Sequence, residues 1–166
     1  MQRVLFVCLG NICRSPTAEA VMQKKVAKAG LNKRIDIDSA GTSNWHEGKR
    51  PDARAIAKGG ERGYDLNSLH ARQAIAADFE QFDYILAMDQ SNYDDLAAIA
   101  PEGLNSKLSL FLDFSKQDRY REVPDPYYGG DEGFALVLDL IEDACDGLIE
   151  HIVQTQTQAQ TKGGGV

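Results

Sequence analysis

The feature that most constrains the fold of this chain is a short, unbroken apolar run at residues 4–7. A run of this length, rich in strand formers and followed by a turn, is typical of a strand covered on both faces in a parallel sheet. A second such run lies at residues 84–88, and patterns at residues 34–40 and 107–111 indicate two further strands. Helical patterns separate the four segments, so the sequence predicts an α/β fold with a parallel sheet.

Helix signals fill the intervals between these strands. The first helix is expected to start at Ser15-Pro16, because serine is a preferred N-cap and proline suits the first helical position. It is expected to stop near Gly30, since glycine commonly ends helices. The remaining helices are expected over residues 51–63, 70–80, 89–100 and about 130–152.

Composition and charge limit the kinds of partner. The chain has 166 residues and a formal net charge of -7, which argues against nucleic-acid binding because phosphate backbones require a basic surface. No run approaches the ~18 apolar residues that would span a bilayer, so no membrane association is expected. We assign residues 1–153 to one domain and expect the polar, low-complexity residues 154–166 to form a disordered tail.

The cysteine count points to a reducing compartment. Three cysteines, Cys8, Cys13 and Cys145, are too few and odd in number for a disulfide scaffold. The first apolar run is also too short for a signal peptide, so a cytoplasmic protein is expected. The three histidines do not combine with the cysteines in a zinc-like spacing, and neither a metal nor another cofactor is expected.

The segment between the first strand and the first helix has the pattern of an anion site. Cys8 stands at the strand end and Arg14 follows six positions later, so five residues turn into the helix start. Their N–H groups can surround one point, and the helix N-terminus adds positive potential there. Gly10 and Asn11 tolerate the positive φ that a tight turn requires. Arg14 can offer a planar pair of donors to two phosphate oxygens.

The same potential favours the thiolate form of Cys8, which is the reactive nucleophile. Ser15 is placed where its hydroxyl can donate to that thiolate. The expected reaction forms a cysteinyl-phosphate that water then hydrolyses. Cys13 has two readings at this point: a small buried residue, or a thiol that pairs with Cys8 and protects it from over-oxidation.

A general acid and a substrate slot complete the prediction. Asp125 lies between two prolines that would fix its carboxyl group, although the same tripeptide is also a common turn signal. Candidate walls for an aromatic slot are Trp45, Tyr127 and Tyr128, together with Leu9 and Ile12 of the loop; ordinary packing is the alternative for each aromatic residue.

Over residues 1–152 these features resemble the low-molecular-weight protein tyrosine phosphatases. The resemblance rests on one motif near each end and on three supporting segments. The motifs are Val7-Cys8-Leu9-Gly10-Asn11-Ile12-Cys13-Arg14-Ser15-Pro16 and Asp125-Pro126-Tyr127-Tyr128, and the supporting segments are Asp38-Ser39-Ala40-Gly41-Thr42, Arg72-Gln73 and Phe82-Asp83-Tyr84-Ile85-Leu86-Ala87-Met88-Asp89.

The resemblance implies a three-layer α/β/α sandwich with a four-stranded parallel sheet and a phosphate-binding loop after the first strand. It implies a metal-free reaction in two steps, phosphotyrosine-containing proteins as substrates, and inorganic phosphate as product and competitive ligand. The implied roles are nucleophile for Cys8, phosphate clamp for Arg14, acid and base for Asp125, loop support for Asn11 and Ser39, thiolate partner for Ser15, redox protection for Cys13, and slot walls for Trp45 and Tyr127.

One position departs from the family pattern. Members often carry a histidine three positions before the Arg-Gln pair, where it joins the Asn–Ser network, but this chain has Leu69 there and His70 one position later. The shift leaves two readings for His70, a network member or a surface residue, and we leave it out of the site. Tyr127 and Tyr128 are also candidate phosphorylation sites in a host with tyrosine kinases.

Two other functions compete with this interpretation. An arsenate reductase would share the fold and the loop, but it needs further cysteines near the site, and Cys145 lies on the apolar face of the last predicted helix. A phosphotyrosine-binding module without catalysis would not need both Cys8 and Asp125. The exposed aromatic residues near the slot are compatible with a monomer or a weak dimer.

Overall fold

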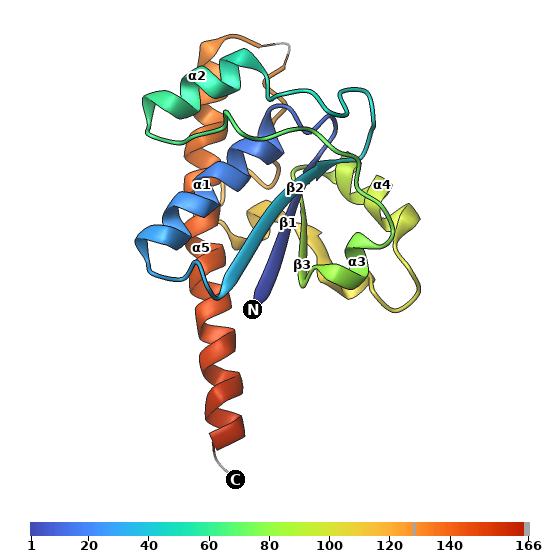
Figure 1. The fold of residues 1–166 in the computed structure, drawn as a ribbon, viewed down its shortest axis with the longest axis vertical. Coiled ribbons are helices and arrows are strands. Elements are labelled where there is room, and N and C mark those ends of the chain that lie inside the picture. The colour runs from blue at the N-terminus through green and yellow to red at the C-terminus, as the bar shows by residue number, and fades with distance from the viewer. Residues whose placement is uncertain (128, 165–166) are drawn as a thin grey trace.

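The computed structural model describes residues 1–127 and 129–164, and it is built on one parallel sheet (Figure 1). The strand order is β2-β1-β3-β4, and every neighbouring pair is parallel. The order places β1, which carries Cys8 at its end, in the interior of the sheet. The strands are β1 Gln2–Cys8, β2 Ile35–Gly41, β3 Tyr84–Ala87 and β4 Leu108–Leu110.

Helices cover both faces of this sheet. In Figure 1, α1, α2 and α5 lie on one side of the strands and α3 and α4 lie on the other. This arrangement confirms the three-layer sandwich. The helices are α1 Arg14–Lys28, α2 Ala53–Glu61, α3 Asp78–Gln81, α4 Gln90–Ile99 and α5 Asp131–Gly164, with short 3-10 turns η1 Asn105–Lys107 and η2 Phe111–Phe114.

The unbroken apolar run of β1 supplies both cores. Val4 and Phe6 belong to the cluster under α1 and α5, whereas Leu5 and Val7 belong to the cluster under α3 and α4. All four side chains are fully buried. Because alternate strand residues point to opposite faces, a strand covered on both sides must be apolar at every position. The interior position of β1 therefore holds the end of the strand, and with it Cys8, at a fixed point.

The structure differs from the sequence prediction at residues 70–80, where only α3 is helical. The backbone N–H of Ala71 donates to the carbonyl oxygen of Lys49 over 2.8 Å, and the N–H of Ala74 donates to that of Gly41 over 2.7 Å. These groups pair with the end of β2 and with the segment that follows it, so they are not available for a helical ladder. Long-range pairing of this kind leaves no periodic signal in the sequence.

The last helix is longer than predicted. It was expected to end near Ile152, with a disordered tail from residue 154, but α5 continues through Gly164. Extending an existing helix requires no new nucleation, and alanine, glutamine and lysine are good helix formers. The C-terminal part of α5 extends away from the sheet in Figure 1. Residues 165–166 lie outside the described part of the chain.

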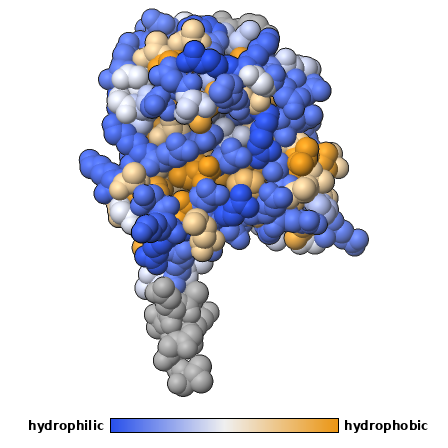
Figure 2. Space-filling view, in the orientation of Figure 1, coloured by the Kyte–Doolittle hydropathy of each residue, from blue (hydrophilic) through white to orange (hydrophobic). Residues whose placement is uncertain are grey.

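The surface seen in Figure 2 is largely hydrophilic, with apolar side chains gathered in a few small patches. Among the described residues, no helix combines the length and the apolar character needed to cross a membrane.

Candidate active site

The phosphate loop, residues 8–15, joins the end of β1 to the first turn of α1. The helix begins at Arg14, and Cys13 is its N-cap residue without a side-chain capping bond. The first N–H groups of a helix have no partner within the helix, so this end offers donors and positive potential to an anion. The sequence predicted a start at Ser15 as N-cap, but the structure uses the Ser15 hydroxyl for another purpose.

Cys8 is buried at the base of this loop, with 3% of its surface exposed. Its Sγ lies 3.0 Å from Ser15 Oγ. The backbone N–H of Asn11 donates to the same sulfur over 3.3 Å. Donors directed at the sulfur stabilise a thiolate.

Asn11 connects the loop to the rest of the protein. Its φ of 57° is in the left-handed region, which asparagine tolerates better than most residues. Its Nδ2 donates to Ser15 Oγ over 2.7 Å and to Ser39 Oγ over 3.0 Å, and its Oδ1 accepts the N–H of Arg72 over 3.1 Å. The structure thus brings together the predicted supports, Asn11 and Ser39, in a buried network.

The end of β2 lies directly against the phosphate loop. A Cβ atom on Gly41 would lie 2.7 Å from the carbonyl oxygen of Leu9 and 3.2 Å from the backbone nitrogen of Asn11. Only glycine permits this approach without a shift of the backbone. The loop is therefore held by the sheet as well as by hydrogen bonds.

Arg14 is almost completely buried, with 2% of its surface exposed. Its Nη1 donates to Asp89 Oδ2 over 2.6 Å and to the carbonyl oxygen of Val123 over 3.0 Å. Burial opposes the charge of the guanidinium, yet the neighbouring Cys8 and Asp89 hold the pKa of Arg14 above its ordinary value. Arg14 is thus a fixed cation, oriented by an aspartate that the sequence analysis did not identify.

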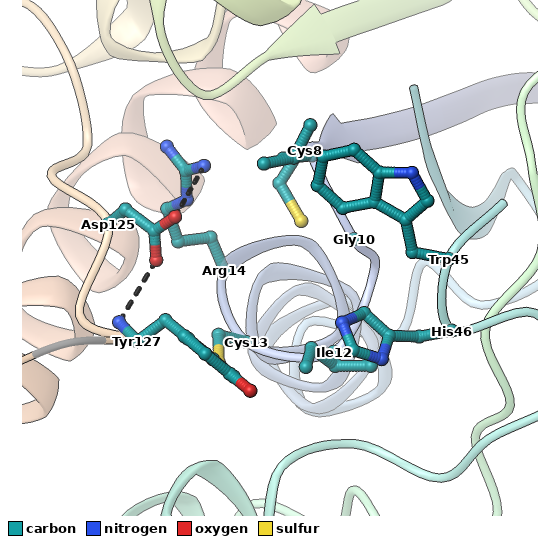
Figure 3. A pocket seen from close by; sticks show the side chains of 10 residues that line it. Cys8, Gly10, Ile12, Cys13, Arg14, Trp45, His46, Asp125 and Tyr127 are labelled. Carbon is teal, nitrogen blue, oxygen red and sulfur yellow. Dashed lines mark hydrogen bonds and ion pairs between the residues drawn. The ribbon is translucent and has the colours of Figure 1, made fainter. Parts of the chain in front are cut away.

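Asp125 lies across the pocket from the loop. Its Oδ2 lies 3.5 Å from Arg14 Nη2, and its Oδ1 accepts the N–H of Tyr127 over 3.0 Å. Figure 3 shows Asp125 between these two residues, with the Cys8 sulfur facing the same space. The structure therefore brings Cys8, Arg14 and Asp125 to one pocket, although Asp125 lies far from the other two in the sequence.

A cavity of about 140 Å³ opens above Cys8. Trp45 and His46 line one side and Tyr127 lines the other (Figure 3). Trp45 is 69% exposed, so the opening is shallow on that side. Leu9, Gly10, Ile12 and Cys13 line the remaining wall. Tyr128, the third predicted aromatic wall, lies outside the described residues.

His46 was missed by the sequence analysis. Its ring lies over the loop, where a Cβ atom on Gly10 would come within 2.9 Å of His46 Cδ2. It also faces Tyr127, with ring centroids 6.4 Å apart. A lone histidine after a tryptophan in a long loop carries no sequence signal of this contact.

Cys13 is buried at the edge of the same pocket. Burial, reinforced by the nearby Asp52 carboxylate, raises the pKa of the Cys13 thiol to about 12. Cys13 is therefore a neutral thiol at ordinary pH. Cys8, Cys13 and Cys145 are all free.

The two readings of His70 are resolved by its exposure. His70 is exposed, whereas Leu69 is half-buried against the larger core cluster. Within the described residues, no hydrogen bond joins His70 to Asn11 or Ser39. The polar residue that contacts Ser39 from the other side is Glu19, which the sequence analysis also missed.

Comparison with known proteins identifies the family. The family model for low molecular weight phosphotyrosine protein phosphatase matches residues 3–159. The low molecular weight phosphotyrosine protein phosphatase of Schizosaccharomyces pombe is 49% identical over 133 residues, which cover 80% of this chain and 85% of the yeast protein.

Solved structures agree with this match. The crystal structure of a protein tyrosine phosphatase from Entamoeba histolytica superposes with a TM-score of 0.91 at 46% identity, covering 94% of this chain and 99% of that one. A Drosophila protein described as an arginine phosphatase superposes with a TM-score of 0.84 at 35% identity, covering 92% and 98%. The chain belongs to the low molecular weight phosphotyrosine protein phosphatase family.

Proposed function

We propose that this protein hydrolyses phosphotyrosine in proteins, and small aryl phosphates, through a cysteinyl-phosphate intermediate. The observation that carries the proposal is the convergence of three groups on one pocket: the Cys8 sulfur beside the Asn11 N–H and the Ser15 hydroxyl, the buried Arg14 guanidinium, and the Asp125 carboxyl group. These groups supply a nucleophile, a phosphate clamp and a proton donor, which is the complete set for this chemistry.

In the first step, the Cys8 thiolate attacks phosphorus and the bond from phosphorus to the ester oxygen breaks. Asp125, as the carboxylic acid, gives its proton to that oxygen, so the phenol leaves neutral. Arg14 and the N–H groups of the phosphate loop hold the phosphoryl oxygens, whose charge develops in the transition state. Because Asp89 fixes Arg14, little reorganisation is required.

In the second step, Asp125 acts as the base. Its carboxylate takes a proton from water, and the oxygen attacks phosphorus while the sulfur–phosphorus bond breaks. The Cys8 thiolate and inorganic phosphate are released, and the phosphate can rebind as a competitive ligand. Every proton is accounted for by Asp125 and water. The two steps as proposed therefore use no cofactor.

Aromatic walls favour an aryl ester over an alkyl one. Trp45 and Tyr127 stand on opposite sides of the cavity, and Ile12 lines the wall formed by the phosphate loop. A phenyl ring can bury apolar surface between them, whereas phosphoserine is too short to fill the same space. Because one structural relative is described as a Drosophila arginine phosphatase, phosphoarginine is the alternative substrate to compare with phosphotyrosine.

The first test is hydrolysis of an aryl phosphate at about pH 5.5, with a chelator present, by the wild type and by Cys8→Ser. Phosphotyrosine, phosphoserine and phosphoarginine peptides of one sequence are then compared. We expect chelator-resistant turnover that Cys8→Ser abolishes and a preference for phosphotyrosine. No turnover by the fully reduced protein would instead favour a binding module, and a preference for phosphoarginine would correct the substrate.

Three further features belong to the proposal. We assign catalysis to residues 1–153, because Ile152 is the last fully buried side chain among those described in α5, and a chain truncated after residue 153 should keep its activity. A cytoplasmic location suits a chemistry that needs a reduced Cys8. The exposed rings of Trp45 and Tyr127 support a monomer or a weak dimer, which sedimentation equilibrium would distinguish.

A further inference from the structure

A buried carboxyl group lies behind the phosphate loop and has no part in the two steps above. Glu19 is on α1, and 7% of its surface is exposed. Its Oε1 accepts the hydroxyl of Ser39 over 2.6 Å, and its Oε2 accepts Gln23 Nε2 over 3.1 Å. Keeping a buried carboxyl group ionised costs free energy, so the burial of Glu19 suggests that it has a role in the protein.

Hydrogen bonds connect Glu19 to the nucleophile without a gap. The chain runs from Glu19 to Ser39, from Ser39 to Asn11, from Asn11 to Ser15, and from Ser15 to Cys8. All five side chains are buried. Such a chain can transmit the state of one end to the other, because each hydroxyl has a single hydrogen to donate.

The directions of these bonds agree when they are derived from Glu19 at one end and from Arg72 beside Asn11. An ionised carboxylate only accepts, so Ser39 must donate to it, and Ser39 must then accept from Asn11 Nδ2. The N–H of Arg72 independently holds Asn11 Oδ1 as an acceptor, which fixes the amide in this orientation. The second hydrogen of Nδ2 goes to Ser15 Oγ.

Ser15 is thereby left as a donor. Its own hydrogen can go to the carbonyl oxygen of Ala40, 3.2 Å away, or to Cys8 Sγ, 3.0 Å away. The thiolate is the stronger acceptor because it is charged. We propose that Glu19 is a positioning residue for catalysis: in its ionised form it strengthens the hydrogen bond from Ser39 and so holds Asn11, and with it Ser15, more firmly beside the Cys8 sulfur.

The surroundings of Glu19 make this order sensitive to pH. Burial raises the pKa of Glu19 to about 7; the Ser39 hydrogen bond lowers it, the nearby Asp38 raises it, and Gln23 and Arg72 lower it. The Arg72 guanidinium forms ion pairs with Asp38 and Asp78, so its positive charge is largely balanced by these two carboxylates instead of by Glu19. Within the described residues, no cation forms an ion pair with Glu19.

The sign of the effect follows from the bond strengths. A hydrogen bond to a charged group contributes about 1 kcal/mol more than one to a neutral group, which corresponds to about fivefold in an equilibrium or rate constant. Ionised Glu19 therefore holds Ser39 more firmly than neutral Glu19 does. The support for the loop is present above the pKa of Glu19 and weakens as the pH falls through about 7.

The test compares wild type, Glu19→Gln and Glu142→Gln. Glutamine has the size of glutamate but carries no charge at any pH. Glu142 is the matched control, because it is a half-buried carboxylate on α5 that accepts the Tyr64 hydroxyl away from the pocket. The readouts are kcat/KM for an aryl phosphate with a good leaving group, which depends little on Asp125, and the rate of Cys8 alkylation by iodoacetamide.

We expect the ratio of wild type to Glu19→Gln to be near one at about pH 5 and to rise to about fivefold at about pH 8 in both readouts. Glu142→Gln should follow the wild type throughout. A ratio that does not change with pH, or an equal change in Glu142→Gln, would overturn the proposal.

A second variant tests the proposal in case Glu19→Gln does not fold. Ser39→Ala breaks the chain while leaving Glu19 in place, and it should lower both readouts and remove their step near pH 7. A retained step in Ser39→Ala would overturn the proposal. The kcat/KM readout of this inference rests on the proposed function, whereas alkylation of Cys8 reports on its thiolate even if the protein is not a phosphatase. Failure of the Glu19 proposal can therefore be distinguished from failure of the proposed function.

Discussion

The two halves of the active site are built differently. The phosphate loop of residues 8–15 lies in the core, and its polar side chains Asn11, Arg14 and Ser15 are at most 2% exposed. Asp125 lies at the edge: its side chain is 38% exposed, and its carboxyl group contacts Arg14 at 3.5 Å and the N–H of Tyr127. The proposed phosphate-binding residues are thus fixed by the fold, whereas the proposed proton donor, Asp125, is held by local contacts.

Because of this difference, substitutions in the two halves should affect stability and activity differently. Changes in the loop network remove buried hydrogen bonds, so they should affect both folding and activity. A change at Asp125 leaves the core intact and should affect activity alone.

Replacing the nucleophile should have the largest effect. Cys8→Ser keeps a small polar group beside Ser15 and Asn11, but a serine hydroxyl is not ionised by the loop. We expect turnover of aryl phosphates to fall to background while inorganic phosphate still binds, as measured by calorimetry. Activity near that of the wild type would show that the buried loop does not supply the nucleophile.

Replacing the acid should have a smaller and selective effect. Asp125→Asn keeps an oxygen for the N–H of Tyr127 but cannot transfer a proton. We expect kcat to fall by about 10²–10⁴-fold for poor leaving groups, and much less for good ones. The melting temperature should stay within the error of the wild type. An equal loss for every leaving group would contradict the acid role.

The same contrast explains what the sequence could predict. The loop is contiguous in sequence, and a strand, a tight turn and a helix start leave strong local signals, so Cys8, Arg14 and their neighbours were identified from residues 4–16 alone. Asp125 could be predicted only from its two flanking prolines and from the resemblance to the phosphatase family. Its approach to Arg14 is a tertiary contact that no local pattern encodes.

The residues that were missed share one property: their partners are distant in the sequence. Asp89 orients Arg14, Glu19 binds Ser39, and His46 covers Gly10. Each of these side chains also has an ordinary local explanation: Asp89 is an N-cap, Glu19 is a residue within α1, and His46 is a loop residue. The helix predicted over residues 70–80 failed for the same reason, because its backbone groups pair with residues near Gly41.

Breaking the network at its centre should affect both properties at once. Asn11→Ala removes three side-chain hydrogen bonds and places alanine at a positive φ. We expect unfolding in urea to cost about 2–4 kcal/mol less and kcat/KM to fall as well. Asn67→Ala, an exposed asparagine, is the control and should change neither. A loss of activity without a loss of stability would mean that the loop is not anchored in the core.

Ionisation of the buried Glu19 should also change the free energy of unfolding with pH. The pKa of Glu19 is raised from 4.5 to about 7 on folding, so the folded state binds this proton more tightly. The associated stabilisation is complete below pH 4.5 and is lost as the pH rises through about 7. Glu19→Gln should therefore lose less stability than the wild type between about pH 5 and 8 in urea unfolding. Parallel curves would contradict the assignment.

The smallest effect is expected at Cys13 in the absence of oxidant. Its thiol is neutral and buried, so Cys13→Ala should retain most of the phosphatase activity. We propose that Cys13 protects Cys8 by forming a disulfide with its sulfenic acid after peroxide treatment. Activity of Cys13→Ala should then recover less completely than that of the wild type when a reducing agent is added. Equal recovery would leave Cys13 as a packing residue.

In the proposed mechanism, phosphate is transferred to the Cys8 sulfur and then to water. Rapid quenching of the reaction with an aryl phosphate in acid, followed by mass spectrometry of the peptide that contains residues 4–14, tests this directly. We expect phosphate on Cys8 in the wild type, accumulation of that adduct in Asp125→Asn with a good leaving group, and none in Cys8→Ser. Full turnover without phosphate on Cys8, or phosphate on another residue, would contradict it.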